Sequence, residues 1–140
     1  MKITFKADKP ELAPWRGNDE DAGFDVRAAE GATIPPMGMA MVSTGLKLGL
    51  PKGYHADVRP RSGLMAKHAI VAQSGLIDSG YRGTIKVCLT NHSRTDFFEI
   101  VPGDRIAQLV IHRDLDVTFA EGDLTESGRG ENGFGSSGRQ

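Results

Sequence analysis

Cysteine, aromatic residues and long apolar runs are all scarce in this sequence. Cys88 is the single cysteine, so neither an internal disulfide nor a cysteine-based metal cluster can form. No apolar stretch approaches the roughly 18 residues that a membrane-spanning helix requires, and the first residues lack the apolar region of a signal peptide. An excess of one charge sign is also absent: 17 Lys and Arg stand against 18 Asp and Glu, which argues against a basic nucleic-acid-binding surface. We therefore expect a cytoplasmic protein with no membrane partner and no direct nucleic-acid binding.

Glycine, in contrast, is abundant, with 18 among 140 residues, and a hydrophobic fraction of 39% is enough for one packed core. Long helical periodicity is missing. Short apolar or alternating runs recur instead between turns rich in Gly, Pro, Asn and Asp, a pattern typical of an all-β sandwich, jelly roll or barrel. Cys88 is expected to pack as a small core hydrophobe. Strands are expected at residues 3–6, 24–28, 39–48, 54–59, 69–73, 84–91, 97–101, 105–112 and 116–120.

One short helix is expected after Arg61, with Ser62 as its N-cap and His68 in a structural role near its end. The composition shifts near the C-terminus, where residues 127–138 read SGRGENGFGSSG. Such a segment holds too little apolar surface to order itself. We therefore expect a β-barrel domain over residues 1–122 and a flexible tail over residues 123–140.

Polar segments near turns supply the candidate chemical groups, although each alone also fits an ordinary turn or helix cap. Asp25 is suited to hold a divalent cation, directly or through water. Arg61, Ser62 and Gly63 stand where the first turn of a helix offers N–H groups to an anion. In the tail, Arg129 offers a cation, Phe134 a stacking face, and residues 135–138 backbone N–H groups and hydroxyls that can wrap an anion.

The densest polar segment reads GLIDSGYRG at residues 75–83. Asp78 follows an apolar run and begins a turn, a position suited to a general base, with Tyr81 covering one face of a planar ligand. Farther along, strand alternation predicts that Gln108 points away from the side on which Ala107 and Leu109 lie. The four histidines show no metal-ligand spacing, and the sequence has no nucleophile elbow, Walker loop or zinc signature.

The order of these segments is more specific than any one of them. DAGFDVRA at residues 21–28 is followed by RPRSGL at 59–64, GLIDSGYRGTIKV at 75–87, PGDRIAQL at 102–109 and RGENGFGSSG at 129–138. Together they resemble the five ordered motifs of the trimeric dUTPases (deoxyuridine triphosphate nucleotidohydrolases), over almost the whole chain. The resemblance implies an all-β, jelly-roll-like barrel with one short helix, assembled as a homotrimer whose flexible C-terminal tail closes over the active site of a neighbouring subunit. It also implies Mg2+ as cofactor and hydrolysis of dUTP to dUMP and pyrophosphate, which lowers dUTP and supplies dUMP for dTTP synthesis.

Carried over position by position, the resemblance makes Asp78 the base that deprotonates the attacking water and also contacts the deoxyribose 3′-hydroxyl. Tyr81 would lie under the sugar and exclude ribonucleotides. Mg2+ would be held mainly by the substrate phosphates, with Asp25 contributing through water. The other implied substrate contacts are the uracil-reading hairpin of Gly75, Leu76 and Ile77, the phosphate-binding Arg61, Ser62, Gly63 and Gln108, the backbone of Lys86, and, in the tail, Arg129 on the γ-phosphate, Phe134 on the uracil, and Gly135 and Ser136 around the phosphates.

Two other functions stay open at this point. A dCTP deaminase of the same superfamily would share the fold and the nucleotide site, but deamination needs an acid–base group near the base, usually a glutamate, and residues 60–98 contain none. A regulatory protein would keep the nucleotide site and signal through a partner. The presence of Asp78 together with the complete tail motif favours catalysis.

Overall fold

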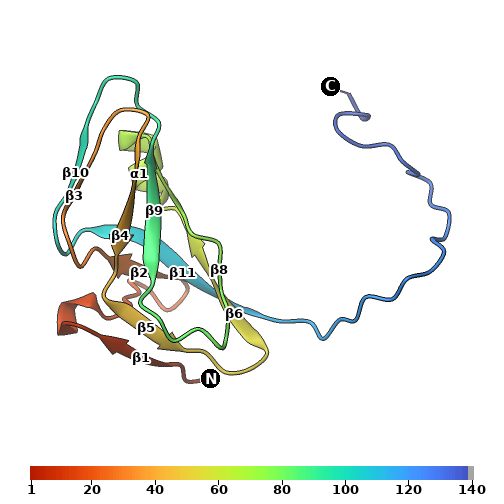
Figure 1. The fold of residues 1–140 in the computed structure, drawn as a ribbon, viewed down its shortest axis with the longest axis horizontal. Helices are drawn as coiled ribbons and strands as arrows, with labels where there is room; N and C mark the ends of the chain where they lie inside the picture. The colour runs from red at the N-terminus through yellow and green to blue at the C-terminus, as the bar shows by residue number, and fades with distance from the viewer. Residues whose placement is uncertain (139–140) are drawn as a thin grey trace.

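The computed structural model describes residues 1–138, which form mostly strands, with one short α-helix and one 3-10 turn (Figure 1). The elements are β1 (Thr4–Ala7), the turn η1 (Pro10–Leu12), β2 (Gly23–Arg27), β3 (Ala32–Ile34), β4 (Met39–Ser43), β5 (Leu46–Gly49), β6 (Tyr54–Arg59), α1 (Ser62–His68), β7 (Ile70–Gln73), β8 (Leu76–Ile77), β9 (Lys86–Asn91), β10 (Phe98–Ile100) and β11 (Arg105–Arg113).

The longest strand, β11, organises the largest sheet. It pairs antiparallel with β2 on one side and β6 on the other, and β8 adds to the free edge of β6. In a second antiparallel sheet β9 lies between β4 and β7, and the pairs β1–β5 and β10–β3 complete the arrangement. Alternate residues of the two larger sheets are buried in one common core, among them Val58 and Leu109 from the first sheet and Val87 and Leu89 from the second. The expected all-β, jelly-roll-like fold with one short helix is confirmed.

The expected strand at residues 39–48 is broken into β4 and β5, which join different sheets. The chain bends at Gly45, whose φ of 63° is left-handed and therefore favours glycine. Thr44 makes the bend tolerable inside the core, because its hydroxyl donates to the Ile85 carbonyl at 2.7 Å and accepts from the Leu46 N–H at 3.2 Å. Two strands were not expected at all: β3 and β8 are too short to produce an alternating pattern.

The expected strand at residues 116–120 does not form within this chain. Its apolar side chains at positions 115, 117 and 119 are 82%, 66% and 97% exposed, and no described strand pairs with the segment. Alternation alone therefore gave a wrong assignment here, because a strand needs a neighbour as well as a pattern. Cys88 also differs from expectation, since it faces outward on β9 with intermediate exposure rather than lying in the core.

The helix α1 has the expected length but a different cap. Arg61 is the N-cap residue, no side chain caps the helix, and Ser62 is already inside the first turn, so the N-cap role expected of Ser62 is wrong. Ala69 ends the helix in the left-handed conformation and donates its N–H to the carbonyls of Leu64 and Met65. The His68 ring packs against Phe98 with 5.1 Å between ring centroids, in keeping with a structural role.

Beyond Arg113, at the end of β11, the chain leaves the body as an extended tail (Figure 1). The backbone hydrogen bonds of its last part are local turns, such as Gly130 N–H to Ser127 and Ser136 N–H to Gly133. The division between a domain at 1–122 and a tail at 123–140 stays a prediction, and residues 139–140 lie outside the described part. Within residues 1–138, no helix is long and apolar enough to cross a membrane.

Candidate active site

A buried carboxylate held by two arginines forms the most tightly connected polar cluster of the protein. Asp25, on β2, accepts a hydrogen bond through Oδ2 from Arg105 Nη1 at 3.1 Å. Its Oδ1 lies 3.2 Å from Arg61 Nε, close enough for an ion pair, although that buried nitrogen makes no aligned hydrogen bond. Arg61 also donates through Nη1 to the Arg105 carbonyl at 3.3 Å. The cluster therefore joins β2, the start of α1 and the start of β11.

A β-bulge brings Arg105 to this cluster. Arg105 is in register with Arg27, but Ala107 is already in register with Val26, so Ile106 is an extra residue on β11. Ile106 and Ala107 are consequently both buried, and a bulge of this kind redirects the side chains next to it. The sequence analysis did not select Arg105, because period-two alternation contains no signal for an inserted residue.

Gln108 lies beside the cluster, as alternation predicted. It stands opposite Asp25 on β2 and opposite Arg59 on β6, between the buried Ala107 and Leu109. Gly23 makes room for it, since a Cβ at that position would lie 2.9 Å from Gln108 Oε1. A polar hollow of about 470 Å3 opens here, lined by residues that include Trp15, Asp21, Asp25, Arg105 and Gln108. Ser62 and Gly63 follow Arg61 directly, and their N–H groups lack partners within the helix.

The segment with Asp78 forms a second group, at the end of β8. Tyr81 donates its N–H to the Asp78 carbonyl at 3.1 Å and its hydroxyl to the Thr84 carbonyl at 3.1 Å. The Tyr81 ring then covers Gly83, where any Cβ would overlap the phenol. Gly83 is thus required by the ring that the sequence analysis selected. The Asp78 side chain points into solvent from this closed turn.

The neighbouring hairpin leaves part of its backbone free. Val58 donates its N–H to the Gly75 carbonyl at 3.2 Å, and Ile77 is in register with Ala56. Because alternate residues of an antiparallel strand face the partner, the N–H and carbonyl of Leu76 point away from β6, toward the open edge of the sheet. Gly75 supports this path with a φ of 70°.

Ser74, which the sequence analysis did not assign a role, joins this hairpin to the second sheet. Its hydroxyl lies 3.0 Å from the Lys86 carbonyl and accepts from the Cys88 N–H at 3.1 Å. Ser74 therefore continues the β7–β9 ladder with its side chain while the backbone crosses to β6. Lys86 itself is exposed at the start of β9.

The two groups of predicted site residues lie apart within one chain. Asp78 follows Ile77, which is in register with Ala56, itself in register with Ile111. Asp78 is therefore two strand spacings across and four residues along from Gln108, roughly 16 Å by ordinary sheet dimensions. Since a hydrogen-bond donor must approach within roughly 3 Å of its acceptor, the two groups cannot hold one phosphate together within a single chain.

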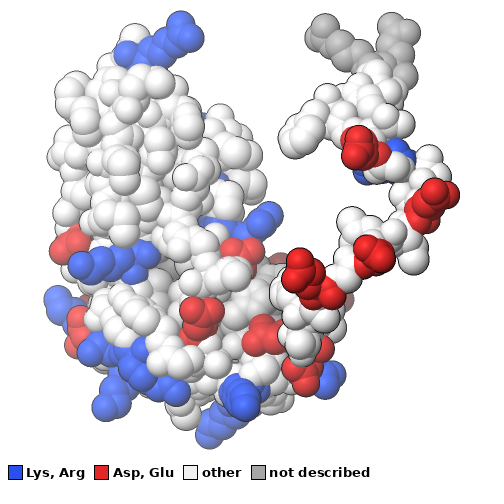
Figure 2. All heavy atoms as spheres, turned by 45° about the vertical axis from the view of Figure 1, so that its right-hand side comes forward, with Lys and Arg blue, Asp and Glu red and all other residues white. Residues whose placement is uncertain are grey.

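The tail residues lie apart from both groups, on the segment that runs away from the body (Figure 1). Phe134 is fully exposed, with a φ of 45°, and Gly135 follows with a φ of 91°. Arg129 donates through Nε to the Asn132 carbonyl at 2.8 Å, and Ser136 closes a turn onto Gly133. Figure 2 shows acidic side chains spaced along this tail.

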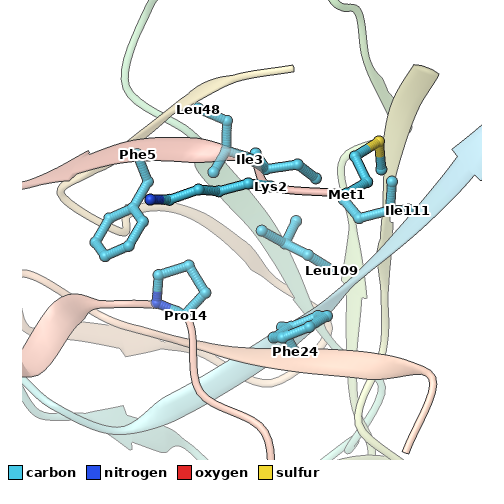
Figure 3. Close-up of a pocket in the computed structure, with 9 residues that line it drawn as sticks. All are labelled: Met1, Lys2, Ile3, Phe5, Pro14, Phe24, Leu48, Leu109 and Ile111. Carbon is cyan, nitrogen blue, oxygen red and sulfur yellow. The ribbon is translucent and has the colours of Figure 1, made fainter. Parts of the chain in front are cut away.

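A separate pocket is apolar and contains none of the predicted site residues. It measures about 320 Å3 and lies between the N-terminal residues and the inner ends of β2 and β11 (Figure 3). Phe5, Phe24, Leu109 and Ile111 are among its lining residues. An apolar lining is unsuited to a polyphosphate, so the polar hollow at Asp25 is the better candidate for an anionic ligand.

The donor set fits a metal ion that brings most of its own ligands. Among the described residues, no group of three His, Cys, Asp or Glu side chains is placed to hold a metal. Asp25 has further lone pairs beyond those that face the arginines, so it can accept a hydrogen bond from a metal-bound water. This suits Mg2+, which keeps several waters and combines one or two carboxylates with substrate phosphates.

Comparison with known proteins identifies one family. The dUTPase family model matches residues 10–138. The chain is 50% identical to the deoxyuridine 5′-triphosphate nucleotidohydrolase of Solibacter usitatus over 144 residues, covering 99% of this chain and 97% of that protein. It is 44% identical to the protein of the same name from Candida albicans over 142 residues, covering 99% and 88%.

Solved structures agree with this result. The dUTPase of Staphylococcus bacteriophage 80alpha with dUpNHpp matches with a TM-score of 0.90 and 28% identity over 99% of each chain. A mutant dUTPase from phage phi11 of S. aureus, which coordinates a structural Mg(II) ion, matches with a TM-score of 0.82 over 91% of this chain and 100% of that one. Its identity is 24%, so this second likeness shows the fold alone.

Asp25→Asn should lower the stability of the protein, because an amide leaves Arg61 and Arg105 without their shared counter-charge. We expect a loss of about 1–2 kcal/mol in the free energy of unfolding, limited by the partial exposure of Arg105. Chemical denaturation at one protein concentration measures it. The control is Asp19→Asn, at a fully exposed carboxylate paired with Arg16, which should change stability by less than about 0.5 kcal/mol. Equal losses in the two variants would contradict the role given to the Asp25 cluster.

Proposed function

The chain belongs to the dUTPase family of dUTP diphosphatases, and we propose that it hydrolyses dUTP to dUMP and pyrophosphate by attack of an Asp78-activated water on the α-phosphorus, with Mg2+. The observation that carries this proposal is the pairing of two complementary half-sites. One half offers arginines and Gln108 around a polar hollow, and the other offers a free backbone edge beside an exposed carboxylate.

The uracil and sugar belong to the half-site around β8. The free N–H and carbonyl of Leu76 form a donor and acceptor pair of the kind that a uracil edge requires, and the flanking Gly75 and Ile77 hold that edge in place. Tyr81, fixed by its bond to Thr84, would lie under the deoxyribose and leave no room for a 2′-hydroxyl. The backbone at Lys86 borders the same hairpin through Ser74.

The triphosphate belongs to the other half-site. Arg61 and Gln108 would donate to phosphate oxygens, together with Ser62 and Gly63 at the start of α1. Mg2+ would be held mainly by the substrate phosphates, with Asp25 contributing through water, and would neutralise charge on the triphosphate. Asp25 has a further task in this proposal, since it keeps Arg61 and Arg105 in place before the substrate arrives.

The chemical step follows from the position of Asp78. Its carboxylate would accept a proton from a water molecule, whose oxygen forms a new bond to the α-phosphorus while the bond from that phosphorus to the bridging oxygen breaks. Pyrophosphate then leaves without a covalent enzyme intermediate. Positioning and fixed positive charge would do most of the work, as in other phosphoryl transfers.

The separation of the half-sites supports a homotrimer with sites between subunits. In one chain Asp78 lies roughly 16 Å from Gln108 by sheet geometry, and a second copy would bring its own hairpin to the phosphate-binding half. The tail would then close the site from a neighbouring subunit, with Arg129 on the γ-phosphate, Phe134 stacked on the uracil, and Gly135 and Ser136 around the phosphates. Such a segment orders only when its ligand is present.

In the cell, this reaction would lower dUTP and supply dUMP for dTTP synthesis in the cytoplasm. The absence of any Glu in residues 60–98 disfavours the alternative of a dCTP deaminase. A regulatory nucleotide-binding protein is the other alternative, and its activity would not require the catalytic carboxylate.

A substrate panel tests the proposal. Pyrophosphate release from dUTP, dTTP, dCTP and UTP, with and without Mg2+, should be confined to dUTP with Mg2+, because the Leu76 edge and Tyr81 restrict base and sugar. Equal rates on UTP would contradict the role of Tyr81. Ammonia released from dCTP, measured in the same reactions, would favour the deaminase instead.

Asp78→Asn should lower kcat by at least about 100-fold, because an amide cannot accept the proton of the attacking water. Binding of the non-hydrolysable dUpNHpp, measured by calorimetry, should stay within a few-fold of wild type. Asp19→Asn is the matched control and should leave both values unchanged. Near-normal turnover by Asp78→Asn would remove the proposed base.

Deleting residues 128–140 should abolish most dUTP hydrolysis and leave the fold intact, because the described tail hydrogen bonds from Ser127 to Gly138 are local to the tail. Thermal unfolding and kcat/KM of the truncated chain measure the two effects. Full-length Arg129→Ala should reproduce part of the loss. An unaffected rate would favour a regulatory protein over an enzyme with a closing tail.

A further inference from the structure

We propose that Trp15 is a positioning residue for the phosphate half of this site, one that holds the Arg105 guanidinium against Asp25. The inference rests on the proposed function and assigns a role to a side chain outside all five motif segments. Trp15 is the single tryptophan of the chain. It lies in the irregular stretch between η1 and β2, where strand patterns predict nothing.

The backbone fixes the indole next to Asp25. Trp15 donates its N–H to the Asp25 carbonyl at 3.1 Å, and Asp25 donates its N–H to the Trp15 carbonyl at 2.6 Å. This isolated antiparallel bridge places the two residues directly opposite each other, so their side chains start as cross-strand neighbours. The position of the indole is therefore tied to the same residue that binds both arginines.

The guanidinium of Arg105 is held on two sides. Its Cζ lies 5.5 Å from the centre of the Trp15 ring, within cation–π range, while Nη1 donates to Asp25 Oδ2 at 3.1 Å. A guanidinium offers a flat face for an aromatic ring and an edge of N–H donors for carboxylates or phosphates. Trp15 takes the face and Asp25 takes part of the edge.

This division suits a site for a polyanion. An incoming triphosphate competes with Asp25 for the arginines, and an Arg105 side chain that is 40% exposed would follow the phosphates out of the cluster. The indole carries no charge, so it restrains the guanidinium without using any of its N–H donors. Arg105 can then face the phosphates while Asp25 and Arg61 keep their arrangement.

The surrounding loop closes on the indole. A Cβ at Gly17 would lie 3.1 Å from Trp15 Cη2, so glycine lets the loop pass close to the ring edge. Trp15 and Gln108 both line the polar hollow. A ligand in the hollow would therefore change the environment of the indole as well as that of Arg105.

Steady-state kinetics with dUTP and Mg2+ test the proposal. Trp15→Ala should raise KM about threefold to tenfold, the scale of a lost cation–π contact, with kcat within twofold of wild type. Trp15→Phe, which keeps an aromatic face, should recover part of the loss. Phe97→Ala removes an exposed aromatic ring elsewhere and should leave KM unchanged. Thermal unfolding of each variant shows whether stability falls independently of KM.

Coupling to Arg105 separates positioning from general packing. In an Arg105→Lys background, Trp15→Ala should raise KM little further, because lysine has no flat face to stack. Independent effects of the two changes would overturn the proposal. So would a wild-type KM in Trp15→Ala while the wild type hydrolyses dUTP, and that result would leave the proposed function standing. A wild type that hydrolyses no dUTP would overturn both.

The fluorescence of Trp15 gives a readout that needs no turnover. Titration with dUpNHpp and Mg2+ should change the emission in a saturable way, with a smaller amplitude in Arg105→Lys. The change should persist when residues 128–140 are deleted, since the hollow belongs to the body. Binding seen by calorimetry without any change in emission would overturn the placement of Trp15 at the ligand.

Discussion

The pairing of β11 with both β2 and β6 places almost every polar group discussed for the phosphate half of the site. It puts Asp25, Gln108 and Arg59 in one row across three strands. The bulge at Ile106 then turns Arg105 back toward Asp25. A one-residue change in this register would move Gln108 to the core side and separate the carboxylate from its arginines. The burial of Ala107 and Leu109 on the opposite face makes such a slip costly, so the core of the barrel fixes the geometry of the site.

Much of this arrangement was predictable from the sequence, and the failures have definite causes. The strands around Val58, Val87 and Leu109 follow from alternation because one face of each is buried. The break at Gly45 and the bulge at Ile106 were missed because each depends on a single residue whose neighbours still alternate. Ser62 has the right residue type for an N-cap, but the helix starts one residue earlier. The apolar pattern at residues 116–120 looks like a strand and finds no partner within the chain. Asp25, Arg61 and Gln108 were selected individually, whereas Arg105 and Trp15 became visible only through contacts.

Charge is distributed unevenly between the body and the tail. Residues 1–113 hold fifteen Lys and Arg against twelve Asp and Glu, whereas the remaining residues hold two against six. Figure 2 shows the acidic side chains along the tail and basic ones over the lower part of the body. An acidic segment is repelled by a triphosphate, so Arg129 carries the phosphate attraction of residues 114–138 alone. The same imbalance draws the tail toward basic surfaces of the body, of its own chain or of another copy, before any nucleotide binds.

The two ends of the proposed site thus meet a ligand in opposite ways. At the phosphate end, Asp25 and Trp15 already hold Arg105, and Gly23 already gives Gln108 its place, so binding there costs little ordering entropy. At the tail, Phe134 and Gly135 have no packed surroundings in the described structure and must lose conformational freedom when they close. A rigid phosphate end can bind first and hold the substrate while the slower ordering of the tail completes the site. Exclusion of water other than the attacking molecule then depends on the tail, and the selectivity for charge depends on the barrel. Because the two tasks fall on different parts of the chain, changes in the tail should act mainly on turnover and changes around Asp25 mainly on binding.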